Sequence, residues 1–156
     1  MRARVLKPPV PFDFDAQMPS VFFADSIEMG RAEDWQSRIT SALADLDVII
    51  LNPRRDEWDA TWRQSIDNAK FREQVDWELD AQARATVIAM YFAPSTQAPI
   101  SLLELGLFAS SGKLIVCCPD GYWRKGNVEI VCVRYSIPLV DDLDALAATA
   151  RARLAR

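Results

Sequence analysis

The amino-acid sequence predicts an α/β domain built on a mostly parallel sheet. Short apolar runs suited to buried strands recur along the chain, and segments with apolar residues at helical spacing separate them. Strands of a parallel sheet are covered on both faces, so they are apolar throughout, and helices must connect them. With 156 residues, 50% of them hydrophobic, the chain can bury the core of one ordinary domain. We assign that domain to residues 20–156.

The first half of the chain is expected to hold an arm, two strands and a helix. Residues 1–19 contain four prolines and no helical or strand period, so we expect an extended arm that lies on the domain or on a neighbouring subunit. Strands are expected at residues 21–24 and 48–51. The helix between them is indicated by apolar residues at helical spacing and by acidic residues near its start, namely Trp35, Ile39, Leu43 and Leu46, with Glu33 and Asp34.

The second half alternates helix and strand. A long helix precedes residue 85, and strands are expected at residues 87–92 and 114–118. A further helix is expected to start near Pro99, a residue favoured in a first helical turn, and to end at about residue 110. The stripe that the long helix should bury consists of Phe71, Val75, Leu79 and Gln82.

Residues 127–140 are compatible with a strand or with a helix. The composition of residues 128–133 suits a strand, yet Asn127 is a good helix N-cap and Glu129 suits a first turn. The alternation of strand and helix favours a helix, followed by a fifth strand at residues 137–140. An amphipathic helix, acidic at its start and basic at its end, is expected over residues 141–156.

Composition excludes several classes of function. The net charge of −4 argues against a broad nucleic-acid-binding surface. The chain has no histidine, which removes Ser-His-Asp and Cys-His catalysis and His-based zinc sites. Proton transfer must then come from carboxylates, Lys, Tyr, Cys or water. No apolar stretch can span a bilayer and no signal-peptide pattern is present, so we expect a cytoplasmic protein without a membrane partner.

The three cysteines are expected to be free thiols. Cys117 and Cys118 are adjacent in an apolar run, where a strand would point them to opposite faces, and Cys132 leaves an odd number. Without a CxxC motif or histidine they do not indicate a metal site, so no metal is expected.

Two carboxylates stand out near the carboxyl ends of the expected strands, where ligands of such sheets bind. Glu104 lies one turn into a helix, between apolar residues, where the helix dipole favours its ionised form by about 0.3–1 kcal/mol. A nucleophilic carboxylate must be ionised, fixed and poorly hydrated, although the position also suits a residue that faces water. Glu78 falls on the buried stripe of the long helix, where a carboxylate needs a partner or a function. Glu73, Asp76 and Asp80 are taken as solvated.

Aromatic and basic side chains gather in the same loops. Arg54 and Arg55 precede Trp58 and Trp62, and residues 121–127 hold two aromatic and two basic side chains. Aromatic rings stack on nucleobases, and arginine binds phosphate or carboxylate.

Six motifs, in order and at compatible spacing, fall between residues 20 and 140. They are Phe22-Phe23-Ala24-Asp25-Ser26-Ile27-Glu28-Met29-Gly30, Asp34-Trp35-Gln36, Asn52-Pro53-Arg54-Arg55, Glu73-Gln74-Val75-Asp76-Trp77-Glu78, Leu103-Glu104-Leu105-Gly106 and Tyr122-Trp123-Arg124-Lys125-Gly126-Asn127-Val128-Glu129. Together they resemble the nucleoside 2-deoxyribosyltransferase-like family.

The resemblance implies a three-layer, Rossmann-like or flavodoxin-like sandwich with a five-stranded parallel sheet. It also implies an enzyme that exchanges the base of a (deoxy)nucleoside: Glu104 attacks the anomeric carbon and holds the sugar covalently, Glu78 positions it, and Asn127 reaches into a neighbouring subunit's site. A homodimer or larger homo-oligomer with shared active sites is therefore expected, with a nucleoside or nucleotide as substrate and no cofactor. The candidate substrate-binding residues are Phe22, Asp25, Asn52, Arg54, Arg55, Trp58, Trp62, Trp123 and Arg124.

The chain departs from the family pattern at three places. Relatives usually end the first strand with Ala-Gly, whereas Asp25 here places a carboxylate where the sugar or phosphate should approach, which would disfavour a 5′-phosphate. Thr86 replaces an acidic residue, and residues 96–99 lack the Asp or Gly that often precedes the catalytic helix. Two alternatives therefore stay open: a hydrolase that transfers the sugar to water, and a nucleotide-binding module without turnover.

Overall fold

The fold is a parallel sheet covered by helices on both faces, as the sequence predicts. The computed structural model describes residues 2–25, 34–55, 59 and 61–156. All strand pairs in this part of the chain are parallel, and the order is β1-β3-β2-β4-β5-β6. The strands are β1 (Arg4–Leu6), β2 (Ser20–Ala24), β3 (Ile49–Leu51), β4 (Val87–Tyr91), β5 (Leu114–Cys117) and β6 (Leu139–Val140).

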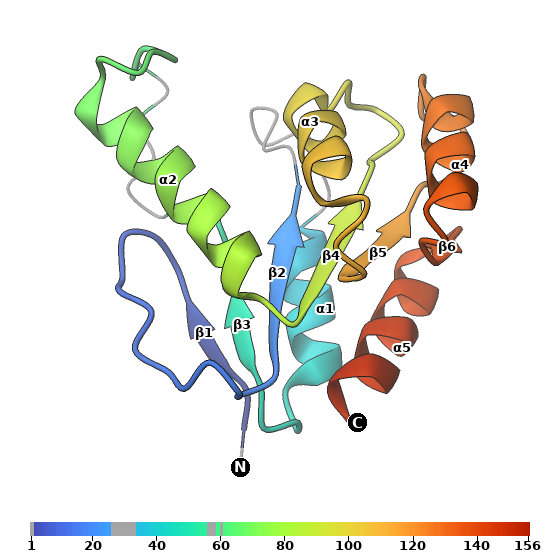
Figure 1. Ribbon diagram of the computed structural model, residues 1–156, viewed down its shortest axis with the longest axis horizontal. Coiled ribbons are helices and arrows are strands. Elements are labelled where there is room, and N and C mark those ends of the chain that lie inside the picture. Colours follow the sequence, from blue (N-terminus) through green and yellow to red (C-terminus); the bar gives the residue numbers. More distant parts are fainter. Residues whose placement is uncertain (1, 26–33, 56–58, 60) are drawn as a thin grey trace.

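Five helices form the two outer layers in the described residues. They are α1 (Trp35–Leu43), α2 (Ala69–Arg84), α3 (Pro99–Phe108), α4 (Lys125–Arg134) and α5 (Leu143–Leu154). Helices α2, α3 and α4 pack on one face of the sheet, and α1 and α5 on the other (Figure 1). Successive strand residues alternate between the two cores: Phe22 and Ile88 face α2 and α3, whereas Phe23 and Ala89 face α1 and α5.

The sixth strand comes from the predicted arm. β1 pairs with β3, with Arg4 opposite Ile49 and Leu6 opposite Leu51. The sequence did not predict this strand. A three-residue strand at the edge of a sheet pairs on one side only and stays partly exposed, so it lacks the apolar run that marks a buried strand. The rest of the arm packs on α2 of the same chain. The Trp77 indole N–H donates to the Val10 carbonyl at 2.9 Å, and its ring lies 5.2 Å from that of Phe12.

The buried face of α2 differs from the predicted stripe. The buried residues are Gln74, Trp77, Ala81 and Gln82, whereas Val75 is partly exposed and Leu79 is exposed. The prediction was correct for Gln82 but wrong for Val75 and Leu79, because it gave apolar residue type priority over the large Trp77 ring, which packs in the core. Two glutamines are buried beside that ring, where each side-chain amide donates a hydrogen bond.

Helix α4 starts three residues earlier than predicted. It begins at Lys125, so Asn127 lies within the first turn and is not the N-cap, a position that Arg124 holds. The preceding loop is fixed by Tyr122, whose buried ring lies 4.9 Å from that of Phe92 and whose hydroxyl donates to the Gln97 carbonyl at 2.7 Å. Because this anchor ends at residue 122, the chain can begin the helix before Asn127.

The three cysteines are free and buried, as predicted. Burial raises the pKa of the Cys117 thiol to about 12 and those of Cys118 and Cys132 to about 11, so the thiols stay protonated and weakly nucleophilic at neutral pH. Within the part of the chain that the structure describes, no helix combines the length and the apolar character needed to cross a membrane.

Candidate active site

The candidate active site lies where the connections from two adjacent strands leave in opposite directions. β2 continues through α1 to β3 on one side, while β4 continues through α3 to β5 on the other. Such a switch point is where open α/β sheets bind ligands, beyond the carboxyl ends of the strands. Asp25 directly follows β2, whose last residue, Ala24, pairs with Met90 of β4. Helix α3, which carries Glu104, lies above the arrowheads of these two strands in Figure 1.

Three carboxylates belong to this site, and each has a glutamine partner. The amide of Gln36 donates to Asp25 Oδ2 at 2.8 Å, and the amide of Gln82 donates to Glu104 Oε2. Glu78 interacts with Gln74, whose amide also donates to the Pro53 carbonyl at 2.9 Å. A neutral amide orients a carboxylate without cancelling its charge, so the site is polar, fixed and acidic.

The site holds Glu104 as a buried carboxyl group. Only 6% of the residue is exposed. Burial raises its pKa to about 7, with a smaller contribution from the charge of Asp25, and the hydrogen bond from Gln82 opposes the rise. A substantial share of Glu104 is therefore ionised at neutral pH, in a poorly hydrated position.

Glu78 holds its proton more strongly than Glu104 does. Burial raises its pKa to about 8, the charge of Glu104 contributes to the rise, and the hydrogen bond from Gln74 opposes both effects. Because the two carboxyl groups interact, their titrations are coupled, and Glu78 keeps its proton to a higher pH than Glu104 does. The arrangement therefore offers an ionised carboxylate beside a protonated one, which is a pairing that covalent and acid–base catalysis both use.

The raised pKa of Glu78 predicts that the active site destabilises the fold at alkaline pH. The folded-state pKa lies above the ordinary value of 4.5, so the folded chain binds the proton more tightly and stability falls as pH rises from about 4.5 through about 8. We expect Glu78→Gln to be more stable than the wild type at pH 8.5, by about 0.5–2 kcal/mol. Urea unfolding at pH 5.5 and pH 8.5 measures this, and a variant that loses equal stability at both values contradicts it.

The arginines after β3 are held by acidic partners. Arg55 is buried, and its Nη2 lies 2.8 Å from Glu73 Oε1 while its guanidinium stacks 5.2 Å from the Trp62 ring centre. Arg54 is exposed and lies 3.3 Å from a carboxylate oxygen of Asp34. Nearby, the buried Asn52 accepts a 3.0 Å hydrogen bond from the backbone N–H of Arg54, which shapes the turn after the strand. Trp58 lies outside the described residues.

The remaining candidates fall into two environments. Trp123 is exposed, donates from its indole N–H to the Gln97 carbonyl at 3.0 Å and carries the Arg124 guanidinium 4.3 Å from its ring centre. This pair therefore contacts the segment before α3. Asn127 is exposed on α4, whereas Phe22 is buried in the core and does not line the edge of the sheet.

Sequence reasoning did not assign roles to Gln36, Gln74, Gln82 or Ser101. A signal exists for two of them, since Gln74 and Gln82 stand four residues before and after Glu78 and so share its helix face. Ser101 precedes Glu104 by three residues and is fully buried, and its hydroxyl has no hydrogen-bond partner among the described residues. Gln36 carries no such signal, because its partner lies on another element.

The helix that carries Glu104 starts from a strained residue. Ala98, at its N-cap, has a φ of +49° and a ψ of +52°, a left-handed conformation that costs an alanine about 1–2 kcal/mol. Relatives often place Asp or Gly just before this helix, and a glycine would adopt the same conformation without that cost.

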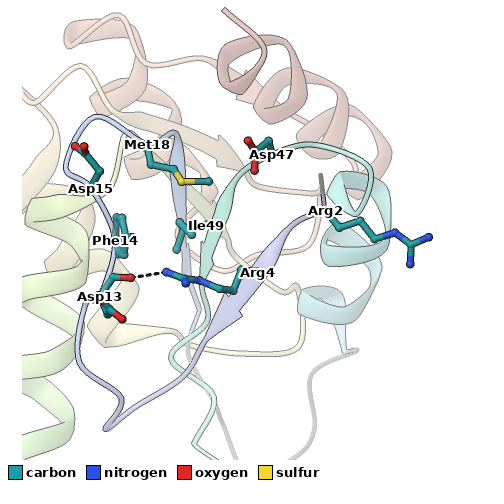
Figure 2. A pocket seen from close by; sticks show the side chains of 8 residues that line it. All are labelled: Arg2, Arg4, Asp13, Phe14, Asp15, Met18, Asp47 and Ile49. Carbon is teal, nitrogen blue, oxygen red and sulfur yellow. Dashed lines mark hydrogen bonds between the residues drawn. The ribbon is translucent and has the colours of Figure 1, made fainter.

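Two surface hollows lie away from the candidate active site. One, of about 450 Å³, lies at the opposite, amino-terminal edge of the sheet, where Arg4 and Ile49 begin their strands (Figure 2). It is lined by Arg2, Arg4, Asp13, Phe14, Asp15, Met18, Asp47 and Ile49. A second, of about 330 Å³, lies on α4 beside Ile130 and Val133. Among the described residues, no group of three or more Cys, Asp or Glu side chains is arranged to hold a metal ion.

Comparison with known proteins agrees with this architecture. The sequence model of a family described as nucleoside 2-deoxyribosyltransferase like matches residues 18–122, which include Asp25, Glu78 and Glu104. A crystal structure of a conserved protein from Enterococcus faecalis V583 shares the fold, with a TM-score of 0.58 and 11% identity over 88% of this chain and 99% of that one. A search of curated proteins gave no match. The match of the family model over most of the chain confirms the resemblance seen in the motifs, and this protein belongs to the nucleoside 2-deoxyribosyltransferase-like family.

Proposed function

We propose that the protein transfers the sugar of a (deoxy)nucleoside from one nucleobase to another through a covalent intermediate on Glu104. The observation that carries the proposal is the state of this carboxyl group: it is buried at the switch point of the sheet, oriented by Gln82, and makes no ion pair with a described residue. A carboxylate that is neither solvated nor neutralised is reactive toward an electrophilic carbon.

Two displacements at the anomeric carbon make up the proposed reaction. In the first, Glu104 attacks C1′, the N-glycosidic bond breaks and the leaving base takes up a proton from water. In the second, a nitrogen of the acceptor base attacks C1′, gives its proton to water, and the bond to Glu104 breaks. Each displacement inverts the configuration, so the product keeps that of the substrate, as in retaining glycosidases.

Glu78 is proposed to position Glu104 and to tune its charge. Its own raised pKa keeps it protonated while Glu104 is ionised, which avoids two adjacent buried charges. Gln82 donates to Glu104 and also to the Glu78 backbone carbonyl at 3.2 Å, so one side chain connects α2 to the nucleophile. Moving α2 would therefore move Glu104.

The main alternative is a hydrolase, in which water takes the place of the acceptor base. A nucleotide substrate would need an anion site, for which the exposed Arg54 and Arg124 are candidates. A binding module without turnover is the third possibility, since Asp25 adds a negative charge to the site. The family name favours base exchange on a nucleoside, and no basic side chain among the described residues contributes to the pKa of Glu104, which gives a phosphate little support there.

A base-exchange assay tests the proposal. Purine and pyrimidine nucleosides, 2′-deoxynucleosides and their 5′-phosphates are incubated with the protein, with and without a free acceptor base. We expect a new nucleoside only when an acceptor is present. Release of free sugar without an acceptor identifies the hydrolase, and binding without either product identifies the binding module.

An exposed apolar surface supports the proposed homo-oligomer. Ile100, Leu103 and Leu107 of α3 and Ile130 and Val133 of α4 are all exposed large hydrophobic residues. Exposed apolar side chains gathered on one face of a helix, as Ile100, Leu103 and Leu107 are by their spacing, are typical of an interaction site. Both helices lie on the same face of the sheet, and α4 carries Asn127, so a symmetric partner could bring its Asn127 to the site.

We expect Ile130→Asp to turn the oligomer into an inactive, folded monomer. The side chain is 68% exposed in the single chain, so a charge there does not disturb the core but blocks an apolar contact with a second copy. Light scattering and the exchange assay measure both effects. Ile66→Asp is a matched control, because Ile66 is 70% exposed but lies in the loop before α2. A wild type that is monomeric at full activity would refute shared active sites.

A further inference from the structure

Most of the buried polar atoms that lack a hydrogen-bond partner lie around the candidate active site. The described residues hold six such side-chain atoms, and five of them belong to Arg55, Gln74, Gln82 and Ser101. A buried donor or acceptor without a partner has lost its hydrogen bonds to water without a replacement, so folded proteins keep few of them. A group of them at one site therefore points to a polar ligand that supplies the missing partners.

Arg55 and Gln74 are held at one junction, between the segment after β3 and the first half of α2. Nη2 of Arg55 lies 2.8 Å from Oε1 of Glu73, the residue before Gln74. Gln74 donates its amide N–H to the carbonyl of Pro53, two residues before Arg55, at 2.9 Å. The Trp62 ring, whose centre lies 5.2 Å from the guanidinium, packs against it. Arg55 and Gln74 are each only 5% exposed, so the two side chains are fixed and poorly hydrated.

The atoms that these contacts leave free are two donors and one acceptor. They are Nε and Nη1 of Arg55 and Oε1 of Gln74, none of which has a hydrogen-bond partner among the described residues. The orientation of the Gln74 amide follows from its partner, because the Pro53 carbonyl can only accept and therefore requires the nitrogen. A doubly ionised phosphate has acceptors only and would leave Gln74 Oε1 unpaired. A nucleobase carries N–H groups as well as ring nitrogen or carbonyl acceptors, so it suits the free atoms better.

The order of the strands places Arg55 across the site from Glu104. Arg55 follows β3, Glu104 lies on the helix that follows β4, and β2 lies between these two strands. Neighbouring strands are about 4.8 Å apart, so the ends of β3 and β4 are separated by about 10 Å. A displacement at C1′ needs its nucleophile and its leaving group on opposite sides of that carbon. A sugar bound beyond the end of β2, with Glu104 on one side, therefore directs its base toward Arg55.

We propose that Arg55 is a catalytic residue that stabilises the negative charge of the leaving base. The inference rests on the proposed reaction at Glu104 and adds the group that helps the base to leave. As the C1′–N bond breaks, its electron pair moves onto the base. A guanidinium that donates to a ring nitrogen or a carbonyl oxygen of the base offsets this charge. Arginine stays charged in proteins, and a site with little water strengthens the interaction.

The proposed steps balance as follows. Glu104 forms a bond to C1′ while the C1′–N bond breaks, and the base leaves as an anion that accepts hydrogen bonds from Arg55. Water then gives this anion a proton. The hydroxide that remains takes up the proton that the acceptor base loses in the second displacement, when the bond to Glu104 breaks. Gln74 accepts a hydrogen bond from an N–H of the base and orients it, and no oxidant or cofactor is involved.

The test compares two nucleosides in the wild type and in Arg55→Met, which removes the charge and the donors but keeps a long side chain. The base of inosine leaves as an anion, whereas the base of 7-methylinosine is cationic and leaves uncharged. We expect the substitution to slow release of the inosine base by about 10²–10³-fold more than release of the methylated base. Single-turnover measurements of base release by absorbance give both rates.

Guanidinium ion supplies a second readout. In Arg55→Ala, which leaves space for the ion, millimolar guanidinium should restore part of the rate with inosine and should not accelerate 7-methylinosine. The matched control is Arg72→Met. Arg72 is an exposed arginine of α2 whose Nε lies 3.5 Å from a carboxylate oxygen of Asp76, and this variant should behave as the wild type.

Equal slowing of both nucleosides by Arg55→Met would overturn the inference, and so would wild-type rates with both. A preference for nucleoside 5′-phosphates that Arg55→Met abolishes would also overturn it, because Arg55 would then bind phosphate. If the wild type forms no adduct on Glu104 with either nucleoside, the proposed function fails first. The two failures are thus distinguishable.

Discussion

Replacing Glu104 by glutamine is expected to abolish turnover and to leave the fold intact. The amide keeps the size of the side chain but cannot form a stable bond to C1′. Loss of a nucleophile of this kind raises the barrier by about 4 kcal/mol or more, which corresponds to a decrease of about a thousandfold. The fold should survive because the change removes a buried group whose ionisation is unfavourable in the folded chain.

Mass spectrometry can locate the bond directly. A substrate with fluorine at the 2 position of the sugar destabilises both transition states, and with a reactive base the second step becomes slow enough to trap the adduct. We expect the label on Glu104 in the wild type and none in Glu104→Gln. Asp144→Asn, which replaces an exposed carboxylate on α5, is the control, and in this variant Glu104 should be labelled as in the wild type. Near-wild-type turnover by Glu104→Gln would mean that Glu104 has only a structural role. A label on Glu78 or Asp25 would mean that the labelled residue, and not Glu104, is the nucleophile.

The raised pKa of Glu104 also predicts how the activity of the wild type depends on pH. The pKa of Glu104 is raised to about 7, and in the proposed reaction Glu104 attacks only when it is ionised. We therefore expect kcat/KM to rise with pH up to about 7. The rise reports the coupled carboxyl groups as a set, because Glu78 and Asp25 both influence it.

The sheet could be predicted well from the sequence because its central strands are short and almost entirely apolar. β2, β4 and β5 are buried along their entire length. Because both of their faces are covered, their residues do not alternate between apolar and polar types. β1 could not be predicted in the same way. It lies at an edge, two of its three residues are exposed, and only pairing with β3 makes it a strand.

The carboxylates of the site could be predicted, but the glutamines that hold them could not. Glu104 and Glu78 stand out because burying a charge is costly, so a carboxylate in an apolar context suggests a function. A glutamine gives no comparable signal, since its amide is compatible with surface and interior alike. Gln36 and Gln82 acquire their roles only when α1 and α2 are placed against the ends of β2 and α3, which sequence spacing does not determine.

Replacing Trp35 by alanine should cause a large loss of stability. Trp35 is fully buried at the start of α1, and its ring lies 5.3 Å from that of Phe23 and 5.6 Å from that of Tyr91. It therefore joins α1 to two neighbouring strands at the edge that holds the site. Truncating a buried tryptophan costs about 3–5 kcal/mol, because apolar contacts are lost and a cavity remains. A domain of this size is typically stable by about 5–15 kcal/mol, so much of the margin would disappear.

The matched control is Trp35→Phe. The indole N–H of Trp35 is buried without a hydrogen-bond partner among the described residues, so phenylalanine removes an unsatisfied polar group together with some volume. Those two effects oppose each other, and we expect a loss below about 1.5 kcal/mol, as for other swaps that largely keep volume. Urea unfolding measured by far-UV circular dichroism gives both free energies. If Trp35→Ala loses as little stability as Trp35→Phe, the ring contacts at this position contribute little. In that case α1 is anchored mainly by Ile39 and Leu43. Because Gln36 follows Trp35 directly, the alanine variant should also release Asp25 from its fixed orientation and slow catalysis at temperatures where the chain is still folded.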